Sequence, residues 1–415
     1  MAGFGLSCHS TIHQLLIRSV EPIFVETVDR KLAALGAGAF AVTTDGTLVV
    51  GLLRQIDHAI GASPGATGQA LTLFATAYAV IAPITIRLLR SLSKRTILVG
   101  CLFAFSLTNA ATAAAPSLAI LLLVRSLAGV CAGVFFATAG ATASEPVPPD
   151  RRGRALATVV AGGSLAAAVG VPLGTFLGGV VGWRATFSGV AVLSALIAVV
   201  LLAVIPERAA NLRQVSRPSP HFAVVVAVLA TTLLWATGSF TFFTYVGPIL
   251  HRSLSVTTGL LAGFLFAYGI AGVVGALLGG WLTDRKGPLF TVGAALSIVV
   301  AALATLGYLV RVEARGALVV VTVVLAVYGF GTWAVNPPQQ QRLLATGADG
   351  HLLLSLNASA TYAGVALGSA FGGAVLAGSG ASTVCWVASG LELAALGLAG
   401  AACWSSRADG RRRSR

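Results

Sequence analysis

The sequence places one carboxylate inside a long apolar stretch, AFAVTTDGTLVVGLL at residues 39–53, where Asp45 is the only charged residue. A charge in such surroundings is costly, so it normally faces a cavity or an opposite charge. Arg125 lies inside another apolar stretch and is a candidate partner. Near an arginine the carboxylate stays ionised, whereas in apolar surroundings it takes up a proton. The two residues could therefore form a proton-sensitive switch, or a permanent salt bridge that only fixes helix packing.

Glu392, in VASGLELAAL, is the other acid well inside an apolar stretch. A neutral glutamic acid hydrogen-bonded to a neighbour and a functional role explain it equally well. The six histidines lie at the ends of apolar stretches or in loops, and no HExxH, GxSxG or phosphate-binding GKS/T sequence occurs. We therefore expect neither an enzyme nor an ATP-driven pump, and no metal or cofactor.

Neutral polar and aromatic side chains share faces of other apolar stretches. Residues four apart lie on one helix face, as do Thr332 with Asn336 and Asn357 with Thr361. Such groups suit a modest-sized, partly polar ligand, but they also serve hydrogen bonding between helices. Asn336, before two prolines, is equally explained as the cap of a kink. The cavity candidates are Tyr78, Asn109, Trp235, Ser239, Phe242, Tyr245, Thr332, Asn336, Asn357 and Thr361.

Membrane-spanning helices must position these residues. The chain has 415 residues, of which 56% are hydrophobic and only 10% charged, against about 25% charged in soluble proteins. Apolar runs of roughly 20 residues match the hydrocarbon thickness of a bilayer. The sequence therefore predicts an all-α membrane protein with twelve spans, near residues 32–53, 67–89, 96–114, 117–141, 156–180, 185–205, 222–247, 258–282, 289–310, 316–338, 352–377 and 381–403.

The net charge of +14 would by itself indicate a nucleic-acid partner. With a cytoplasmic N-terminus, however, 21 of the 27 lysines and arginines fall on the cytoplasmic side, as the positive-inside rule requires. Membrane topology and anionic lipid then account for the charge. We expect a monomer in the bacterial inner membrane with both termini in the cytoplasm, and no nucleic-acid partner.

The spans divide into two halves of six. The long polar break at 206–221 separates a bundle at 31–205 from one at 222–404, with a polar, irregular extension at 1–30 and a basic tail at 405–415. The segment GVPLGTFLGGVV at 170–181 resembles GVALGSAFGGAV at 364–375, an offset of 194 residues. The same offset aligns Asp284 with Arg90 and Asp45 with Ser239. We predict an internal duplication in which the second half has no carboxylate equivalent to Asp45.

Depth supports the pairing of Asp45 with Arg125. Asp45 lies about 13 residues, or roughly 20 Å, from the cytoplasmic start of the first span. Arg125 lies about eight residues from the outer end of the fourth, so roughly 18 Å above the inner surface of a ~30 Å core. The two charges are therefore predicted at similar heights.

Several of these segments resemble the major facilitator superfamily, and most closely its twelve-span drug:proton antiporters. TTDGTLVVGLL is similar to the first-span motif of that group and RSLAGVCAG, at 125–133, to its fourth-span motif. RRGRALATVVAGGSLAAAVGVPLGTFLGGVVGWRATF at 151–187 resembles the fifth-span antiporter motif with its flanks. GGWLTDRKG at 279–287 resembles the loop motif Gly-x-x-x-Asp-Arg-x-Gly. FTYVGPIL and NPPQQQRLL also resemble this group.

The resemblance implies two pseudo-symmetric six-helix bundles that export a small molecule, such as a drug, sugar or nucleoside-like compound, in exchange for protons. It implies proton coupling at Asp45 and Arg125. The first-half loop departs from the motif, since Arg90 replaces the acid and Ser93 the glycine. The conformational motif residues would be Arg90, Gly170, Pro172, Gly174, Asp284, Arg285 and Gly287. A facilitator or a proton symporter for uptake of a small metabolite is the alternative, and the GVPLG sequence of the fifth span disfavours it.

Overall fold

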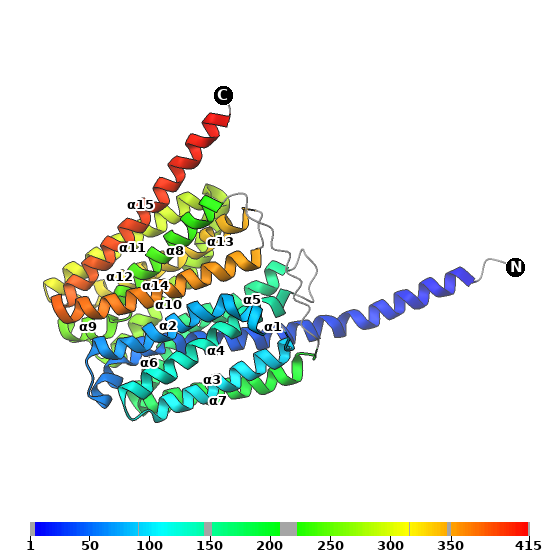
Figure 1. Cartoon of the computed structure of the whole chain (residues 1–415), viewed down its shortest axis with the longest axis horizontal. Coiled ribbons are helices and arrows are strands. Elements are labelled where there is room, and N and C mark those ends of the chain that lie inside the picture. Colours follow the sequence, from blue (N-terminus) through cyan, green and yellow to red (C-terminus); the bar gives the residue numbers. More distant parts are fainter. Residues whose placement is uncertain are drawn as a thin grey trace.

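The computed structural model describes residues 5–89, 91–144, 152–207, 222–314, 316–346 and 350–413. Within these ranges every regular element is a helix. Twelve helical segments there are long and apolar enough to cross a membrane, which confirms the predicted number of spans. Figure 1 shows them as one elongated bundle of roughly parallel and antiparallel helices.

The first six spans belong to the N-terminal half. The fifth of them is interrupted by one π-helical turn, η1, before it continues as α6. The elements are α1 (Gly5–Ile60), α2 (Pro64–Leu88), α3 (Lys94–Ala114), α4 (Leu118–Ser144), α5 (Arg152–Leu165), η1 (Ala166–Gly170), α6 (Val171–Val181) and α7 (Trp183–Val204).

The last six spans repeat this arrangement in the C-terminal half. Two of them are also broken, at Thr244–Tyr245 and at Val335. The elements are α8 (Phe222–Phe243), α9 (Val246–Leu254), α10 (Thr258–Lys286), α11 (Pro288–Arg311), α12 (Leu318–Ala334), α13 (Asn336–Leu344), α14 (Gly350–Ser379) and α15 (Ala381–Arg413).

Short polar residues start several of these helices. The side-chain oxygens of Ser63, Ser93 and Thr257 accept hydrogen bonds from backbone amides in the first turns of α2, α3 and α10. These bonds satisfy amides that have no partner within the helix. Between α10 and α11, Gly287 adopts φ of 88°, a conformation that disfavours residues with a Cβ. Its place in the loop motif is therefore explained by the tight turn.

The N-terminal end of the chain differs from the prediction. The interpretation of residues 1–30 as irregular is wrong for the described part, because α1 is helical from Gly5 onward and projects beyond the bundle (Figure 1). A polar sequence can continue a helix once the membrane-spanning part has nucleated it. Likewise α15 continues through the basic tail to Arg413. Most of the predicted linker, residues 208–221, lies outside the described residues.

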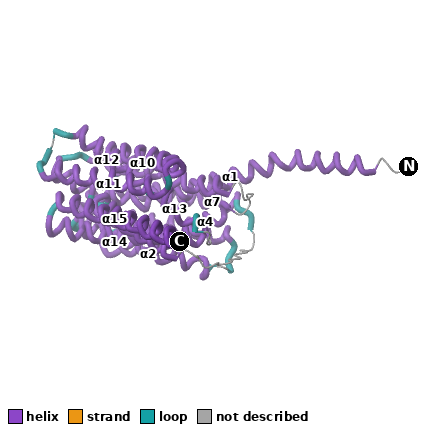
Figure 2. Tube along the Cα trace, turned by 90° about the horizontal axis from the view of Figure 1, so that it is seen from above, coloured by secondary structure: helices purple, strands orange, loops and turns teal. Residues whose placement is uncertain are grey.

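The two halves contact each other along their length. The helix α2 packs against α14, and α10 packs against η1 and α6. In Figure 1 the elements α1 to α7 form one side of the bundle and α8 to α15 the other. Figure 2 shows the same bundle from above, with the helical N-terminus extending away from it. Both halves therefore have six spans, and they form two pseudo-symmetric bundles.

Matching glycine stripes bring the first and fifth spans of each half together. Three glycines of the fifth span, spaced four apart, leave no room for a Cβ against α1, and three glycines of the eleventh span do the same against α8. Small residues at this spacing let helix backbones approach closely in lipid. The stripes are Gly170, Gly174 and Gly178 against Thr44, Leu48 and Leu52, and Gly364, Gly368 and Gly372 against Ala236, Thr237 and Thr241.

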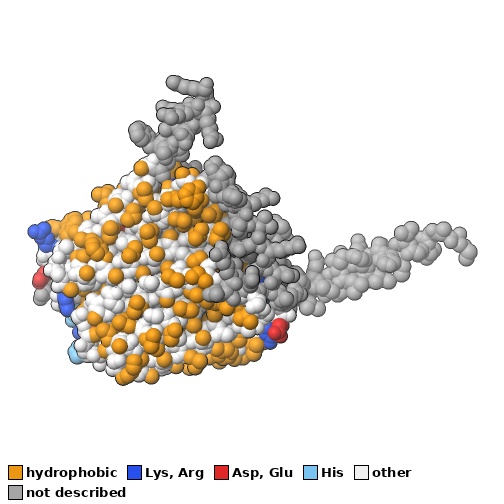
Figure 3. All heavy atoms as spheres, viewed as in Figure 1, with side chains coloured by type: hydrophobic (Ala, Val, Ile, Leu, Met, Phe, Trp, Pro, Cys, Tyr) orange, Lys and Arg blue, Asp and Glu red, His pale blue; other side chains and the backbone are white. Residues whose placement is uncertain are grey.

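The outer surface is apolar. Large hydrophobic side chains such as Leu107, Leu277 and Val319 are more than two-thirds exposed. Figure 3 shows hydrophobic side chains over the visible face of the bundle, with the coloured charged groups near its margins. A soluble monomer rarely exposes so large an apolar area. The surface is that of a protein surrounded by lipid.

Candidate functional site

Asp45 and Arg125 are in direct contact inside the N-terminal half. Arg125 Nη1 donates hydrogen bonds to both carboxylate oxygens of Asp45, at 2.7 and 2.8 Å. Arg125 Nη2 also donates to the backbone oxygen of Asp45, at 3.2 Å. Both side chains are 0% exposed. The predicted partners therefore form one closely bonded, fully buried ion pair between α1 and α4.

Aromatic rings surround the guanidinium. Its central carbon lies 4.7 Å from the ring centroid of Phe74 on α2 and 5.7 Å from that of Phe187 on α7. A cation over an aromatic face is stabilised by the ring quadrupole. The Nε atom of Arg125 has no hydrogen-bond partner among the described residues. The pair is thus held in apolar surroundings, where its mutual attraction is strong and its desolvation is costly.

The fifth span approaches α1 beside this pair. Gly170 ends the π-helical turn and leaves no room for a Cβ against Thr44, the neighbour of Asp45. Pro172 lies at the start of α6, where a helix needs no donor from the proline nitrogen. Gly174 packs on Leu48, one turn further along α1. Gly170 and Gly174 therefore set how closely the fifth span approaches α1 beside Asp45, and Pro172 lies between them at the start of α6.

A second carboxyl group is buried in the C-terminal half. Ser239 Oγ on α8 donates a 2.6 Å hydrogen bond to Glu392 Oε1 on α15. Tyr328 on α12 donates its hydroxyl to the backbone oxygen of Ser239 at 2.9 Å. Glu392 is 0% exposed. The sequence offset aligned Asp45 with Ser239, which has no carboxylate. The structure brings the carboxyl group of Glu392 to Ser239 from the sixth span of that half.

The other predicted cavity residues do not form one lining. Tyr78 on α2 stacks on Tyr362 of α14, with ring centroids 3.6 Å apart, so it lies between the halves. Asn109 is buried near Asp45, and its amide donates to Phe105. Phe242 packs edge-to-face on the Tyr328 ring within the C-terminal half. These side chains mostly fill the helix interfaces in this conformation.

Trp235 and Thr332 are buried with polar atoms that have no partner. Neither Trp235 Nε1 nor Thr332 Oγ1 makes a hydrogen bond to any described residue. Buried polar atoms are normally paired, so each such exception calls for an explanation. Both residues were predicted to contact a ligand, and that contact stays a prediction.

A polar network in the C-terminal half includes residues that the sequence did not single out. Gln339 on α13 donates to the Val228 backbone and to Thr232, and it accepts from Arg342 at 2.8 Å. Thr232 in turn donates to Asn357 Oδ1 at 3.0 Å. Gln339 and Thr232 were missed because single amides and hydroxyls have no distinctive spacing. The run of glutamines after Pro338 was the available signal.

Two other candidates serve local helix geometry. Thr361 donates its hydroxyl to the Asn357 backbone one turn earlier. Asn336 begins α13 directly after the break at Val335, so the predicted kink is present. No side-chain hydrogen bond caps that helix start. Asn336 therefore marks the kink without capping it.

The end of the bundle opposite the termini is closed. Tyr245 donates to the backbone of Ser369 at 2.7 Å, and Ser369 donates to the backbone of Gly68 at 3.1 Å. Arg54 on α1 contacts His251 on α9 at 2.9 Å. The bonds from Ser369 and Arg54 join the two halves. Tyr245, a predicted cavity residue, thus supports the closure of this end.

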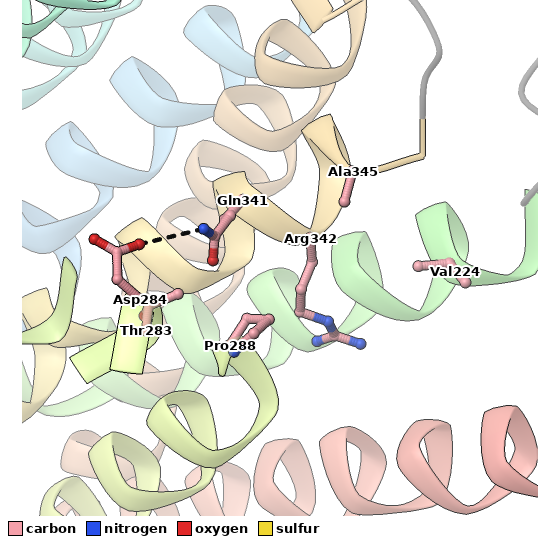
Figure 4. A pocket seen from close by; sticks show the side chains of 7 residues that line it. All are labelled: Val224, Thr283, Asp284, Pro288, Gln341, Arg342 and Ala345. Carbon is pink, nitrogen blue, oxygen red and sulfur yellow. Dashed lines mark hydrogen bonds between the residues drawn. The ribbon is translucent and has the colours of Figure 1, made fainter. Parts of the chain in front are cut away.

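At the termini end, the loop motif borders an open pocket. Asp284 accepts a 3.4 Å hydrogen bond from Gln341, and the Arg285 guanidinium lies 4.2 Å from the Trp281 ring centroid. Figure 4 shows Asp284, Gln341 and Arg342 around this pocket, whose volume is about 560 Å³. Asp284 is exposed, and within the described residues its hydrogen-bond partner is the Gln341 amide. Arg90, the aligned position of the first half, lies outside the described residues.

Two six-span bundles in lipid, with a charge pair buried in one and a closed end between them, have the architecture of a membrane transporter. The chain belongs to the Major Facilitator Superfamily, whose family model matches residues 35–351.

Relatives support this assignment. The chain is 33% identical over 362 residues to the inner membrane transport protein YdhP of Escherichia coli, covering 86% of this chain and 92% of that protein. It is 31% identical over 328 residues to the chloramphenicol efflux pump Rv0191 of Mycobacterium tuberculosis, covering 77% and 79%. The solved structure of a bacterial homologue of the human lysosomal transporter Spinster, inward-facing and unoccupied, superposes with a TM-score of 0.73 at 16% identity, covering 90% and 96%.

Proposed function

We propose that this transporter exports a small molecule across the bacterial inner membrane in exchange for protons, by alternating access. The observation that supports this most is the fully buried pair of Asp45 and Arg125. An ionisable residue inside a membrane span is costly and is normally functional. A pair built from two different helices can be made or broken when those helices move.

The pair would couple protons to transport in two states. In the bonded state the Arg125 guanidinium holds the carboxylate of Asp45 charged. When α1 and α4 move apart, the carboxylate loses its counter-charge in apolar surroundings and takes up a proton. Release of that proton on the other side restores the bond. If substrate binding competes with the proton, export of the substrate is coupled to proton entry, and the proton gradient drives it.

The substrate class follows from the relatives and from the polarity of the interior. One relative is named a chloramphenicol efflux pump, and drug, sugar and nucleoside-like molecules all suit a site of neutral amides, hydroxyls and aromatic rings. Trp235 and Thr332 offer unpaired polar atoms in the C-terminal half. We therefore propose that this half supplies most contacts to the substrate, and that the transporter works as a monomer.

The orientation follows from charge. Basic residues concentrated near the ends of the spans are retained on the cytoplasmic side. Both termini would lie in the cytoplasm, and the closed end, with Ser369 and His251, would face the periplasm. Asp284, Arg285 and Gly287 would then form the cytoplasmic loop that latches the C-terminal half, with Arg90 at the aligned position of the first half.

The first experiment identifies a substrate. An efflux-deficient bacterial host expressing the wild-type chain is screened for growth against a panel of inhibitors that includes chloramphenicol. Transport of a positive compound is then measured in vesicles with and without an imposed proton gradient. We expect the gradient to accelerate wild-type transport, and Asp45→Asn to remove that acceleration in the fraction of the variant that elutes as folded protein.

The control is Glu207→Gln, which neutralises an exposed acid outside the spans. It is expected to keep the wild-type dependence on the gradient. Transport by Asp45→Asn that depends on the gradient as the wild type does would remove Asp45 from the coupling mechanism. Wild-type transport that ignores the gradient would contradict the exchange of substrate for protons.

A further inference from the structure

The carboxyl group of Glu392 has an unusual environment. It is fully buried on α15, and its only hydrogen bond within the described chain is the one that Ser239 donates to Oε1. The second oxygen, Oε2, has no partner there. An ionised carboxylate without a counter-charge is very costly in such a place, whereas a neutral carboxylic acid is tolerated. The geometry therefore fits a carboxyl group with a proton on Oε2.

The helices packed around Glu392 provide no cation. The contacting helices are α8, α11 and α14, with a smaller contact from α9. Among these, α8 has no charged residue, α11 has only Arg311 at its last position, and α14 has only His351 near its start. The charged residues of α9, His251 and Arg252, lie at its end near the closed face. The titratable group that faces this carboxyl is the Tyr328 phenol on α12.

The carboxyl group of Glu392 lies beside Ser239, and Ser239 occupies the position in the C-terminal half that corresponds to Asp45 in the N-terminal half. Asp45 lies 15 residues before the end of α1 at Ile60, and Ser239 lies 15 residues before the end of α9 at Leu254. In each half the fourth span donates to the backbone oxygen of this residue, through Arg125 at 3.2 Å and through Tyr328 at 2.9 Å. Each half therefore has a carboxyl group at the same place.

We propose that Glu392, held by Ser239, is a second proton-binding site, occupied by a proton in this conformation and exchanging it with the medium during the transport cycle. The role of that proton in transport rests on the proposed proton exchange, but the binding site itself rests on the geometry around Ser239. The two buried acids differ in kind. Asp45 has the Arg125 guanidinium as its counter-charge, whereas within the described residues the hydrogen-bond partner of Glu392 is the neutral Ser239 hydroxyl.

Infrared spectroscopy of the full chain in liposomes tests the site without a substrate. A protonated carboxyl group has a carbonyl stretch separate from the amide bands, and this stretch shifts when the proton is replaced by deuterium. The wild type is expected to show such a band at neutral pH, to shift it in D₂O and to lose it as the pH rises. Glu392→Gln should remove the band, while Asp45→Asn and Glu207→Gln should leave it unchanged.

A second variant covers the case in which Glu392→Gln does not fold, as judged by its size-exclusion elution. Ser239→Ala removes the hydrogen bond to Oε1 and should keep the band but shift it to higher frequency. An identical band in the wild type and Glu392→Gln, no effect of Ser239→Ala, or a Glu392 band that does not shift in D₂O would each overturn the proposal. The transport assay on Asp45→Asn is a separate measurement, so the two proposals can fail independently.

Discussion

Arg125 is the largest fully buried side chain in the described part of the chain. Its charge is stable there because Asp45 provides the counter-charge. Moving a guanidinium out of water costs several kcal/mol, which only a close partner and further bonds can offset. Here three hydrogen bonds go to a single residue, two of them to its carboxylate. Each partner therefore stabilises the protein mainly by neutralising the buried charge of the other.

This argument predicts unequal effects of removing one or both charges. Arg125→Ala should destabilise the protein by about 3–5 kcal/mol, because the buried carboxyl group of Asp45 must then either stay charged without a partner or take up a proton. The double variant Asp45→Ala with Arg125→Ala should be more stable than Arg125→Ala alone. Thermal unfolding of the purified protein gives the measurement. Arg184→Ala is the control, since Arg184 is exposed, donates to the Ala115 backbone and lies over the Trp183 ring. A double variant no more stable than the single one would contradict this account.

At the scale of the helix, the glycine stripes fix the separation of the first and fifth spans. The obstacle that a Cβ would meet differs between the two stripes. At Gly368 it is the backbone oxygen of Thr237, which cannot move without the helix. At Gly174 it is the end of the Leu48 side chain, which can change rotamer. The two glycine patterns are alike in sequence, but an alanine should be tolerated better at Gly174 than at Gly368.

The expected order of stability follows from these obstacles. Gly368→Ala should lower the free energy of unfolding by about 1–3 kcal/mol, because the added methyl group overpacks the helix interface. Gly174→Ala should lower it less. Gly189→Ala, on the lipid-exposed side of α7 with nothing within 4 Å, is the matched control. This variant should leave the free energy of unfolding unchanged or raise it by about 0.5–1 kcal/mol, because alanine gives the unfolded chain less conformational entropy than glycine does. Melting temperatures of the three variants in one detergent provide the comparison, and a Gly174→Ala variant less stable than Gly368→Ala would reverse the argument.

At the scale of the whole molecule, few polar bonds join the halves at the closed end. Ser369 crosses from α14 to α2, and Arg54 crosses from α1 to α9. A net hydrogen bond contributes about 1 kcal/mol, which corresponds to roughly a fivefold change in an equilibrium. Each such bond therefore adjusts the balance between closed and open forms without determining it alone.

Ser369→Ala should accordingly favour opening of this end about fivefold. Hydrogen–deuterium exchange should become faster in peptides from the start of α2 and the end of α14. Ser389→Ala is the matched control, because Ser389 also donates to a neighbouring backbone oxygen at 3.1 Å, but within one half. The same exchange increase in both variants would show general loosening, and the closing role of Ser369 would then be wrong.

Much of this arrangement could be predicted from the sequence, because hydropathy and helical rise are periodic. Run lengths gave twelve spans, and rise per residue placed Asp45 and Arg125 at one height, where the structure joins them. The segments that match at the offset of 194 residues, with glycines four apart at 170–178 and 364–372, also match in the structure, because both leave no room for Cβ atoms against a neighbouring helix.

The contacts that could not be predicted join different helices through single polar side chains, and such side chains follow no repeated pattern in the sequence. Nothing in the sequence brings Glu392 to Ser239, 153 residues away. The Gln339 network similarly joins three helices through single polar groups. The π-helical turn at Ala166–Gly170 has no marker except the following proline, and the helical state of Gly5–Arg30 contradicts its polar composition.

The placement of the two buried acids also bears on the ancestry of the chain. Under a duplication of one six-helix unit, Asp45 corresponds to Ser239, and Glu392 corresponds to Ala198, which is buried as well. A single inherited acid cannot therefore account for both groups. At each of the two positions an acid has thus been gained or lost since such a duplication, and the acids that remain lie on different helices, yet at the corresponding place in each half. Among homologues, the two acids should consequently be gained and lost independently of each other.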